Sequence, residues 1–215
     1  MTGVQTCALP ISLSLAQKAK GRTGLNPAVG CVIVKNNKII GKGYHKYFGG
    51  AHAEIEAIKN AKQSILNSTV YVTLEPCAHF GKTPPCADEL IRQKVDKVII
   101  GMIDPNPLVK CKGIEKLKKS GIELEFENLD GQIEFFYRDF SKYIIKKVPY
   151  IKLKAAISID GKIALKNKFS KWISNENSRK YVHKLRNEVD AILIGINTLL
   201  IDNPKLNVRG IENPN

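Results

Sequence analysis

A chain of 215 residues is long enough for one large domain, or for one domain and part of another. Hydrophobic residues make up 43% and charged residues 25%, and no apolar run approaches the ~20 residues that a helix needs to cross a bilayer, so an integral membrane protein is excluded. The net charge of +14 has two interpretations, a generally lysine-rich surface or a positive field that attracts phosphate groups.

Residues 1–11, MTGVQTCALPI, match a translated sequencing-adapter fragment, so we predict that this segment is not native. Residues 12–147 are predicted to form one domain. A break falls at residues 146–149, and residues 148–215 are predicted to begin a second domain. Nothing resembles a signal peptide and two of the five cysteines fit a metal site, which favours the reducing cytoplasm over a disulfide scaffold.

Within residues 12–147, strand patterns alternate with helix patterns. A helix over 12–20 is followed by a loop at 21–30, and β-branched runs at 29–35 and 38–43 flank Asn36-Asn37 as a hairpin. Further elements are expected as helices at 52–61, 86–93, 114–120 and 129–145 and as strands at 68–74, 97–101 and 122–126. This order predicts an α/β layered domain.

The pattern restarts after the break. Strands are expected at 150–157 and 191–195, and helices at 178–187 and 197–201. These elements predict the first part of a second α/β domain with too few strands to close a sheet. A segment of this size buries little apolar surface against its ordering entropy, so we expect it to have no catalytic activity by itself.

The residues with the clearest chemistry are His52, Cys77 and Cys86, with Glu54 beside them. One imidazole and two thiols supply three ligands for a tetrahedral ion, and a zinc site with three protein ligands keeps its fourth position for water, as catalytic sites do. Both cysteines are expected at or near helix N-termini, where the helix dipole favours the ligating thiolate. Glu54 is a carboxylate placed to move protons beside the metal.

The alternative is a structural zinc clip with a fourth protein ligand, for which His45 and His79 are the nearby candidates. Such a clip has no need of Glu54. The loop PCAHFGKTPPC can also bring His79 and Lys82 over the metal, where Lys82 would bind a substrate phosphate. From the residues alone, Lys82 could equally be a solvated loop residue, and Asn26 a simple turn residue.

Three segments carry a family resemblance: TGLNPAVGCVIV, GYHKYFGGAHAEIEAI and VTLEPCAHFGKTPPC. They resemble the deaminase half of the bifunctional riboflavin-biosynthesis family, the diaminohydroxyphosphoribosylaminopyrimidine deaminase/reductases. The resemblance implies a cytidine-deaminase-like three-layer α/β/α domain with Zn²⁺. The implied reaction converts 2,5-diamino-6-(5-phosphoribosylamino)pyrimidin-4(3H)-one to 5-amino-6-(5-phosphoribosylamino)uracil. The implied ligand and catalytic positions are His52, Cys77, Cys86 and Glu54, and those for substrate are Asn26, His45, His79 and Lys82.

The second segment resembles the start of the family's reductase domain, through KLKAAISIDGKIA, SKWIS, KLRNEVDAILIGINTLLIDNP and LNVR. The implied fold is a dihydrofolate-reductase-like α/β domain that uses NADPH. The resemblance implies NADPH contacts from Ala156, Trp172, Thr198 and Asp202, and substrate contacts from Ser170, Arg186, Leu206 and Arg209. The residues alone indicate a core tryptophan at Trp172, a turn at Asp202 and a solvated helix residue at Arg186.

Two other functions stay open. The first is a tRNA or nucleoside deaminase of the same fold, although such enzymes usually have the shorter C-x-x-C spacing between the two cysteine ligands. A non-catalytic zinc-containing RNA-binding module is suggested only by the net charge, and would bind RNA with a steep salt dependence and tolerate Glu54→Ala. The main prediction is a cytoplasmic homo-oligomer that binds a phosphoribosylated pyrimidine, with neither nucleic acid nor membrane as a partner.

Overall fold

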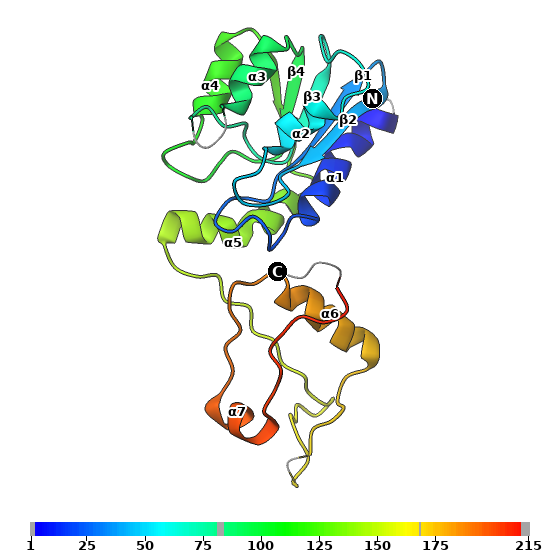
Figure 1. The fold of residues 1–215 in the computed structure, drawn as a ribbon, viewed down its shortest axis with the longest axis vertical. Coiled ribbons are helices and arrows are strands. Elements are labelled where there is room, and N and C mark those ends of the chain that lie inside the picture. Colours follow the sequence, from blue (N-terminus) through cyan, green and yellow to red (C-terminus); the bar gives the residue numbers. More distant parts are fainter. Residues whose placement is uncertain (1–2, 81–83, 168, 212–215) are drawn as a thin grey trace. The chain divides into compact units, whose positions relative to one another are not determined.

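The computed structural model describes residues 3–80, 84–167 and 169–211 (Figure 1). The chain divides into two compact units, Met1–Tyr150 (unit 1) and Ile151–Asn215 (unit 2). Over the described ranges, none of the helices has the length and apolar character needed to cross a bilayer.

Unit 1 is built on a five-stranded sheet in the order β2-β1-β3-β4-β5. The strands are β1 (Gly30–Lys35), β2 (Lys38–Tyr44), β3 (Thr69–Val72), β4 (Lys97–Ile100) and β5 (Glu123–Phe126). β1 pairs antiparallel with β2 and β3, whereas β3, β4 and β5 are parallel. The carboxyl ends of the parallel strands therefore meet at one edge of the sheet, which is where ligand sites of α/β folds gather.

The hairpin between β1 and β2 turns at Asn36 and Asn37, as predicted. Their φ angles are 50° and 56°, so both residues lie in the left-handed region. Two successive positive φ values define the tight turn whose twist matches a two-stranded hairpin, and asparagine tolerates this region better than most residues.

Helices cover both faces of the sheet (Figure 1). On one face, α2 (Ala53–Lys59), α3 (Cys86–Arg92) and α4 (Lys112–Lys119) enclose a core with the side chains of β1, β3 and β4. On the other face, α1 (Gly3–Gln17) and α5 (Gln132–Lys146) pack against the alternate residues of the same strands. The predicted three-layer α/β/α domain is confirmed.

The first helix begins earlier than predicted. α1 starts at Gly3 rather than at residue 12, and it ends at Gln17 rather than at residue 20. Ala8 and Leu9 are fully buried in the same cluster as Leu13 and Ala16. The spacing of these four residues continues one apolar face by helical periodicity, which explains the longer helix. That residues 1–11 are not native stays a prediction.

The second segment forms helices but no sheet. The bounds of α6 (Glu176–Arg186) and α7 (Ile196–Asp202) differ by one or two residues from those of the helices predicted at 178–187 and 197–201. The strands predicted at 150–157 and 191–195 are wrong, because no strand forms among the described residues of unit 2. None of those residues is buried either, and the side chains of Leu153 and Leu193 are 95% and 98% exposed. An extended segment becomes a strand only when a neighbour takes its backbone hydrogen bonds.

Two glycines of β2 bring α2 against the sheet. A Cβ on Gly43 would lie 2.3 Å from the backbone N of Ala57 and 2.4 Å from the carbonyl O of Ala53, and one on Gly41 would lie 2.4 Å from the carbonyl O of Ala57. A side chain at either position would push the helix backbone away from the strand. Because α2 begins directly after His52, this contact also sets where His52 lies.

We predict that Gly43→Ala destabilises unit 1 by ~1–3 kcal/mol, the usual cost of overpacking, and weakens its zinc retention. Hydrogen exchange of the sheet amides and zinc content after dialysis measure the two effects. Gly195→Ala is the control, since nothing lies within 4 Å of the Cβ it would add. Unchanged exchange and zinc content in Gly43→Ala would mean that β2 does not hold the helix in place.

Candidate metal centre

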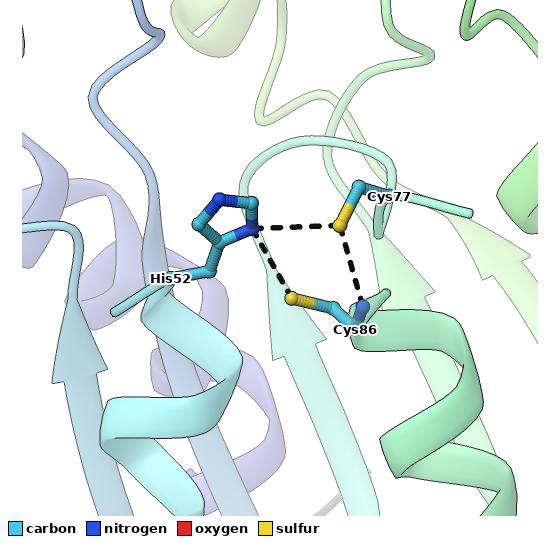
Figure 2. Close-up of side chains that lie close together, drawn as sticks. All are labelled: His52, Cys77 and Cys86. Carbon is cyan, nitrogen blue, oxygen red and sulfur yellow. Dashed lines mark hydrogen bonds between the residues drawn. The ribbon is translucent and has the colours of Figure 1, made fainter. Parts of the chain in front are cut away.

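Three side chains far apart in the sequence meet at the carboxyl end of β3 (Figure 2). His52 is the N-cap residue of α2, Cys86 is the first residue of α3, and Cys77 follows β3. The Nδ1 atom of His52 lies 3.4 Å from the Sγ of Cys77 and 3.3 Å from the Sγ of Cys86. The three predicted ligands are therefore brought together.

The spacing of these donor atoms fits zinc. A sulfur at ~2.3 Å and a nitrogen at ~2.0 Å from one tetrahedral ion lie about 3.5 Å apart. Among the described residues, the group that can hold a metal consists of His52, Cys77 and Cys86, and it includes neither His45 nor His79. Three protein ligands are the pattern of a catalytic zinc site rather than of a closed structural one.

Hydrogen bonds prepare one of the thiols for metal binding. The backbone N–H of Cys86 donates to the Sγ of Cys77 at 3.3 Å. The hydrogen bond with the Cys86 thiol lowers the pKa of the Cys77 thiol below its usual range against the effect of burial, and the hydrogen bond with His52 lowers it further, so the thiolate form of Cys77 is favoured. The hydrogen bond between the two thiols raises the pKa of Cys86, and burial of Cys86 raises it further. The thiolate form is the one that binds metal.

Glu54 lies in the first turn of α2 with only 3% of its surface exposed. Burial raises the pKa of its carboxyl to about 7, with a further contribution from the charge of Cys77, while His52 acts in the opposite direction. A carboxyl group with a pKa near neutrality can both accept and donate a proton at physiological pH. Glu54 lines the same cavity as His52 and Cys77, and its proton-transfer role stays a prediction.

A cavity of about 330 Å³ opens beside the cluster. It is lined by Glu54, His52 and Cys77, and also by three of the four predicted substrate residues, Asn26, His45 and His79. The fourth, Lys82, lies outside the described residues. The structure thus places six of the predicted deaminase residues around one pocket, namely Asn26, His45, His52, Glu54, Cys77 and His79, while their roles stay proposals.

His45 is held as a neutral imidazole in the wall of this cavity. Burial lowers its pKa. Its Nδ1 lies 3.0 Å from the carbonyl O of Ala51, so Nδ1 carries the proton. The Nε2 atom is then the acceptor, and the side-chain Nδ2 of Asn26 lies 3.5 Å from it. Together these two side chains form one polar edge of the pocket.

Sequence reasoning missed three residues that line the pocket: Glu75, Asp104 and Asn106. Asp104 is 9% exposed and follows β4, the parallel neighbour of the strand that leads to Cys77. Burial raises the pKa of its carboxyl. The signal for Asp104 and Asn106 was available in the segment Asp-Pro-Asn-Pro at 104–107, shortly after the strand predicted at 97–101, because carboxyl ends of adjacent parallel strands share one edge.

A buried hydroxyl ties the segments of the site together. The OH of Tyr137 on α5 donates to the carbonyl O of Ala28 at 2.8 Å and lies 2.6 Å from the Oγ1 of Thr73. The backbone N–H of Gly30 donates to the same Oγ1 at 3.1 Å. Tyr137 therefore anchors the loop that carries Asn26 and the end of β3 that leads to Cys77.

The residues predicted to bind NADPH and substrate in unit 2 lie on its surface. Trp172 is 71% exposed, with the guanidinium carbon of Arg179 at 4.4 Å from its ring centre, so it is not a core residue. Thr198 and Asp202 lie on α7, and Ala156 and Ser170 are half-buried in irregular segments.

Three of the four residues predicted to contact the reductase substrate lie near one another. The Nη1 of Arg186 donates to the carbonyl O atoms of Lys205 and Asn207, which flank Leu206, and the Nη1 of Arg209 donates to the Oδ1 of Asn207. These contacts bring Arg186, Leu206 and Arg209 to one place.

Two family models match the chain. Residues 5–102 match the cytidine and deoxycytidylate deaminase zinc-binding region, and residues 149–215 match the RibD C-terminal domain. The first match contains all three predicted ligands and Glu54. It supports zinc as the metal of this site.

Curated relatives match across both regions. The riboflavin biosynthesis protein RibD of Aquifex aeolicus is 47% identical over 201 residues, which are 94% of this chain and 56% of that protein. RibD of Escherichia coli is 42% identical over 201 residues, 94% of this chain and 55% of that protein. The chain spans about half the length of the curated relatives it matches.

Solved structures agree. A diaminohydroxyphosphoribosylaminopyrimidine deaminase/5-amino-6-(5-phosphoribosylamino)uracil reductase from Thermotoga maritima is 41% identical with a TM-score of 0.91, covering 97% of this chain and 60% of that one. RibD of Acinetobacter baumannii is 40% identical with a TM-score of 0.88, covering 98% of this chain and 59% of that one. The chain is therefore a homologue of the RibD proteins, and the resemblance predicted from its sequence is confirmed.

Proposed function

We propose that this chain is a zinc-dependent hydrolase that deaminates a phosphoribosylated diaminopyrimidine in riboflavin synthesis. The substrate would be 2,5-diamino-6-(5-phosphoribosylamino)pyrimidin-4(3H)-one and the product 5-amino-6-(5-phosphoribosylamino)uracil. The observation that carries the proposal is a three-ligand cluster next to a buried carboxyl group, Glu54, in the wall of one cavity. The similarity to RibD proteins over 94% of the chain supports this choice of substrate.

His52, Cys77 and Cys86 would hold the zinc ion. When bound, zinc supplies Lewis acidity, which makes water a nucleophile at neutral pH. Glu54 would take one proton from the attacking water and pass it to the ring nitrogen. It would then take the second proton, from the hydroxyl group newly bonded to the ring carbon, and deliver it to the departing amine as the carbonyl forms. One water is consumed and one ammonia is released, and the carboxylate ends in the state in which it began.

The polar groups around the pocket would orient the substrate. The polar edge formed by Asn26 and His45 would face the pyrimidine, where the second side-chain N–H and the Oδ1 of Asn26 offer a donor and an acceptor, and His79 lines the same cavity. We propose that Lys82 binds the phosphate as a point charge. We further propose that the protein acts in the cytoplasm as a homo-oligomer, and that neither nucleic acid nor a membrane is its partner.

Ammonia release from the diaminopyrimidine ribotide by purified, zinc-loaded protein tests the proposed function directly. Release should stop when a chelator removes the metal and return when zinc is restored. Parallel assays with cytidine, with tRNA and with a salt series of RNA binding test the two alternative functions. Deamination of tRNA alone, or RNA binding with no deamination, would replace the proposal.

We predict that Cys77→Ser and Cys86→Ser each lose most bound zinc and all deamination, because serine is a poor zinc ligand at neutral pH. Metal content after dialysis measures this. X-ray absorption on the unsubstituted protein should show zinc–sulfur distances near ~2.3 Å and a zinc–nitrogen distance near ~2.0 Å. The exposed Cys7 provides the control, and Cys7→Ser should keep its zinc. Full zinc retention in both ligand variants would show that the ligands are assigned wrongly.

We predict that Glu54→Gln keeps zinc and substrate binding and lowers turnover by at least ~100-fold, the lower end of a general acid–base contribution. Glutamine has the same shape but cannot take up a proton. The matched control is Glu56→Gln on the same helix, where Glu56 forms an ion pair with Lys46. Normal turnover of Glu54→Gln would mean that another group transfers the protons.

We predict that this chain shows no measurable reduction of the ribosyl group by NADPH. Hydride transfer needs the nicotinamide held within ~3.5 Å of the acceptor carbon, and the described residues of unit 2 form neither a sheet nor a buried core that would hold it there. Titration with NADPH should leave the fluorescence of Trp172 unchanged once absorption is corrected with free N-acetyltryptophanamide. Saturable quenching at micromolar NADPH, or NADPH oxidation that needs the deaminated product, would contradict this.

A further inference from the structure

The carboxylate of Glu75 is buried and is bound by backbone groups. Only 5% of this residue is exposed. Oε2 accepts from the N–H of Asp104 at 3.2 Å and of Cys111 at 3.0 Å. Oε1 accepts from the N–H of Gly113 at 3.0 Å and of Ile114 at 3.4 Å. Within the described residues, four amide groups rather than a cation surround this buried charge, which is the arrangement that a buried carboxylate requires.

These amides belong to one stretch of chain, residues 102–114. The backbone N–H of Glu75 donates to the carbonyl O of Met102 at 2.9 Å, so the same residue also binds the beginning of the stretch. At its other end, Cys111 is the N-cap of α4 and Gly113 lies in the first turn, where helix amides have no partner within the helix. Glu75 supplies these partners from a separate strand end.

The carbonyl O of Pro76 packs closely against the first turn of α4. A Cβ on Gly113 would lie 1.8 Å from that oxygen. The first turn of α4 therefore lies directly against the segment Glu75-Pro76-Cys77. That segment binds the 102–114 stretch at one end and ends in a proposed zinc ligand at the other.

The 102–114 stretch forms one wall of the cavity, through Asp104, Asn106 and Val109. Asp104 shapes this wall further, because its Oδ1 accepts from the N–H of Asn106 at 2.8 Å. The wall has no strand or helix of its own between β4 and α4. Its position relative to the metal ligands therefore depends on the bonds that Glu75 makes.

We propose that Glu75 is a positioning residue, whose carboxylate holds the 102–114 wall of the pocket in register with the metal ligands and so determines how tightly substrate binds. The proposal rests on the deaminase function proposed above. Glu75 transfers no proton and binds no metal in this arrangement. It acts on substrate through the wall that carries Asp104 and Asn106.

Glu75→Gln is the test, because it keeps the shape while turning an amide NH₂ toward backbone N–H groups that need an acceptor. We expect a zinc content equal to that of the unsubstituted protein. KM should rise by about 10- to 100-fold, since small displacements of substrate-binding groups have effects of this size, and kcat should change by less than about 3-fold. Hydrogen exchange should speed up at the amides of Cys111 and Gly113, with β3 and β4 amides unchanged.

Glu115→Gln is the matched control, since Glu115 is an exposed residue in the first turn of the same helix. It removes the same charge and should change neither KM nor amide exchange. Glu75→Asp keeps the charge on a shorter side chain and should give an intermediate KM. It also replaces the glutamine variant if that variant does not fold.

Three results would overturn the proposal: loss of zinc from Glu75→Gln, a fall in kcat at unchanged KM, or exchange at Cys111 and Gly113 equal to that of the control. Absence of ammonia release from the unsubstituted protein would instead reject the proposed function. In that case the exchange measurement still decides whether Glu75 holds the 102–114 stretch, because it needs no substrate.

Discussion

The site depends on two helices that begin beside each other near the carboxyl end of β3 (Figure 2). His52 precedes the first turn of α2 and Cys86 begins α3, so the positive ends of two helix dipoles point at the same small volume. This field favours a thiolate, and the N–H of Cys86 donates to the sulfur of Cys77 directly. The close approach of α2 to Gly41 and Gly43 then sets the distance between the histidine and the thiols. The packing of α2 against the sheet therefore also determines where the metal ligands lie.

The sequence predicted the parts of this arrangement that local chemistry determines. His52, Glu54, Cys77 and Cys86 could be recognised because metal ligands and proton carriers are few in kind and their spacing was informative. The turn at Asn36-Asn37 could be recognised from residue preference alone. Glu75 could not, because its four partners lie 29 to 39 residues away and are backbone amides, which look alike in every sequence.

The errors in the fold prediction have the same origin. Residues 150–157 have the composition of a strand, but a strand exists only with a hydrogen-bonded neighbour, and the described part of unit 2 supplies none. In α1, by contrast, a tertiary partner was present and the element extended beyond its predicted start. Ala8 and Leu9 extend the apolar face of a helix that was expected to start later, and packing on β1 and β3 decided the outcome. Local pattern proposes an element, and its tertiary partners determine whether it forms.

Two buried carboxyl groups show how environment assigns chemical roles within one pocket. Glu54 and Glu75 are both almost fully buried and both line the cavity. Burial raises the pKa of Glu54 to about 7, so its proton is exchangeable at physiological pH. Glu75 uses its oxygens to accept from four backbone amides, and these contacts hold one wall of the pocket in place. In the roles proposed here, the same type of side chain transfers protons at Glu54, where burial raises its pKa, and positions a wall at Glu75, where four backbone amides bind it.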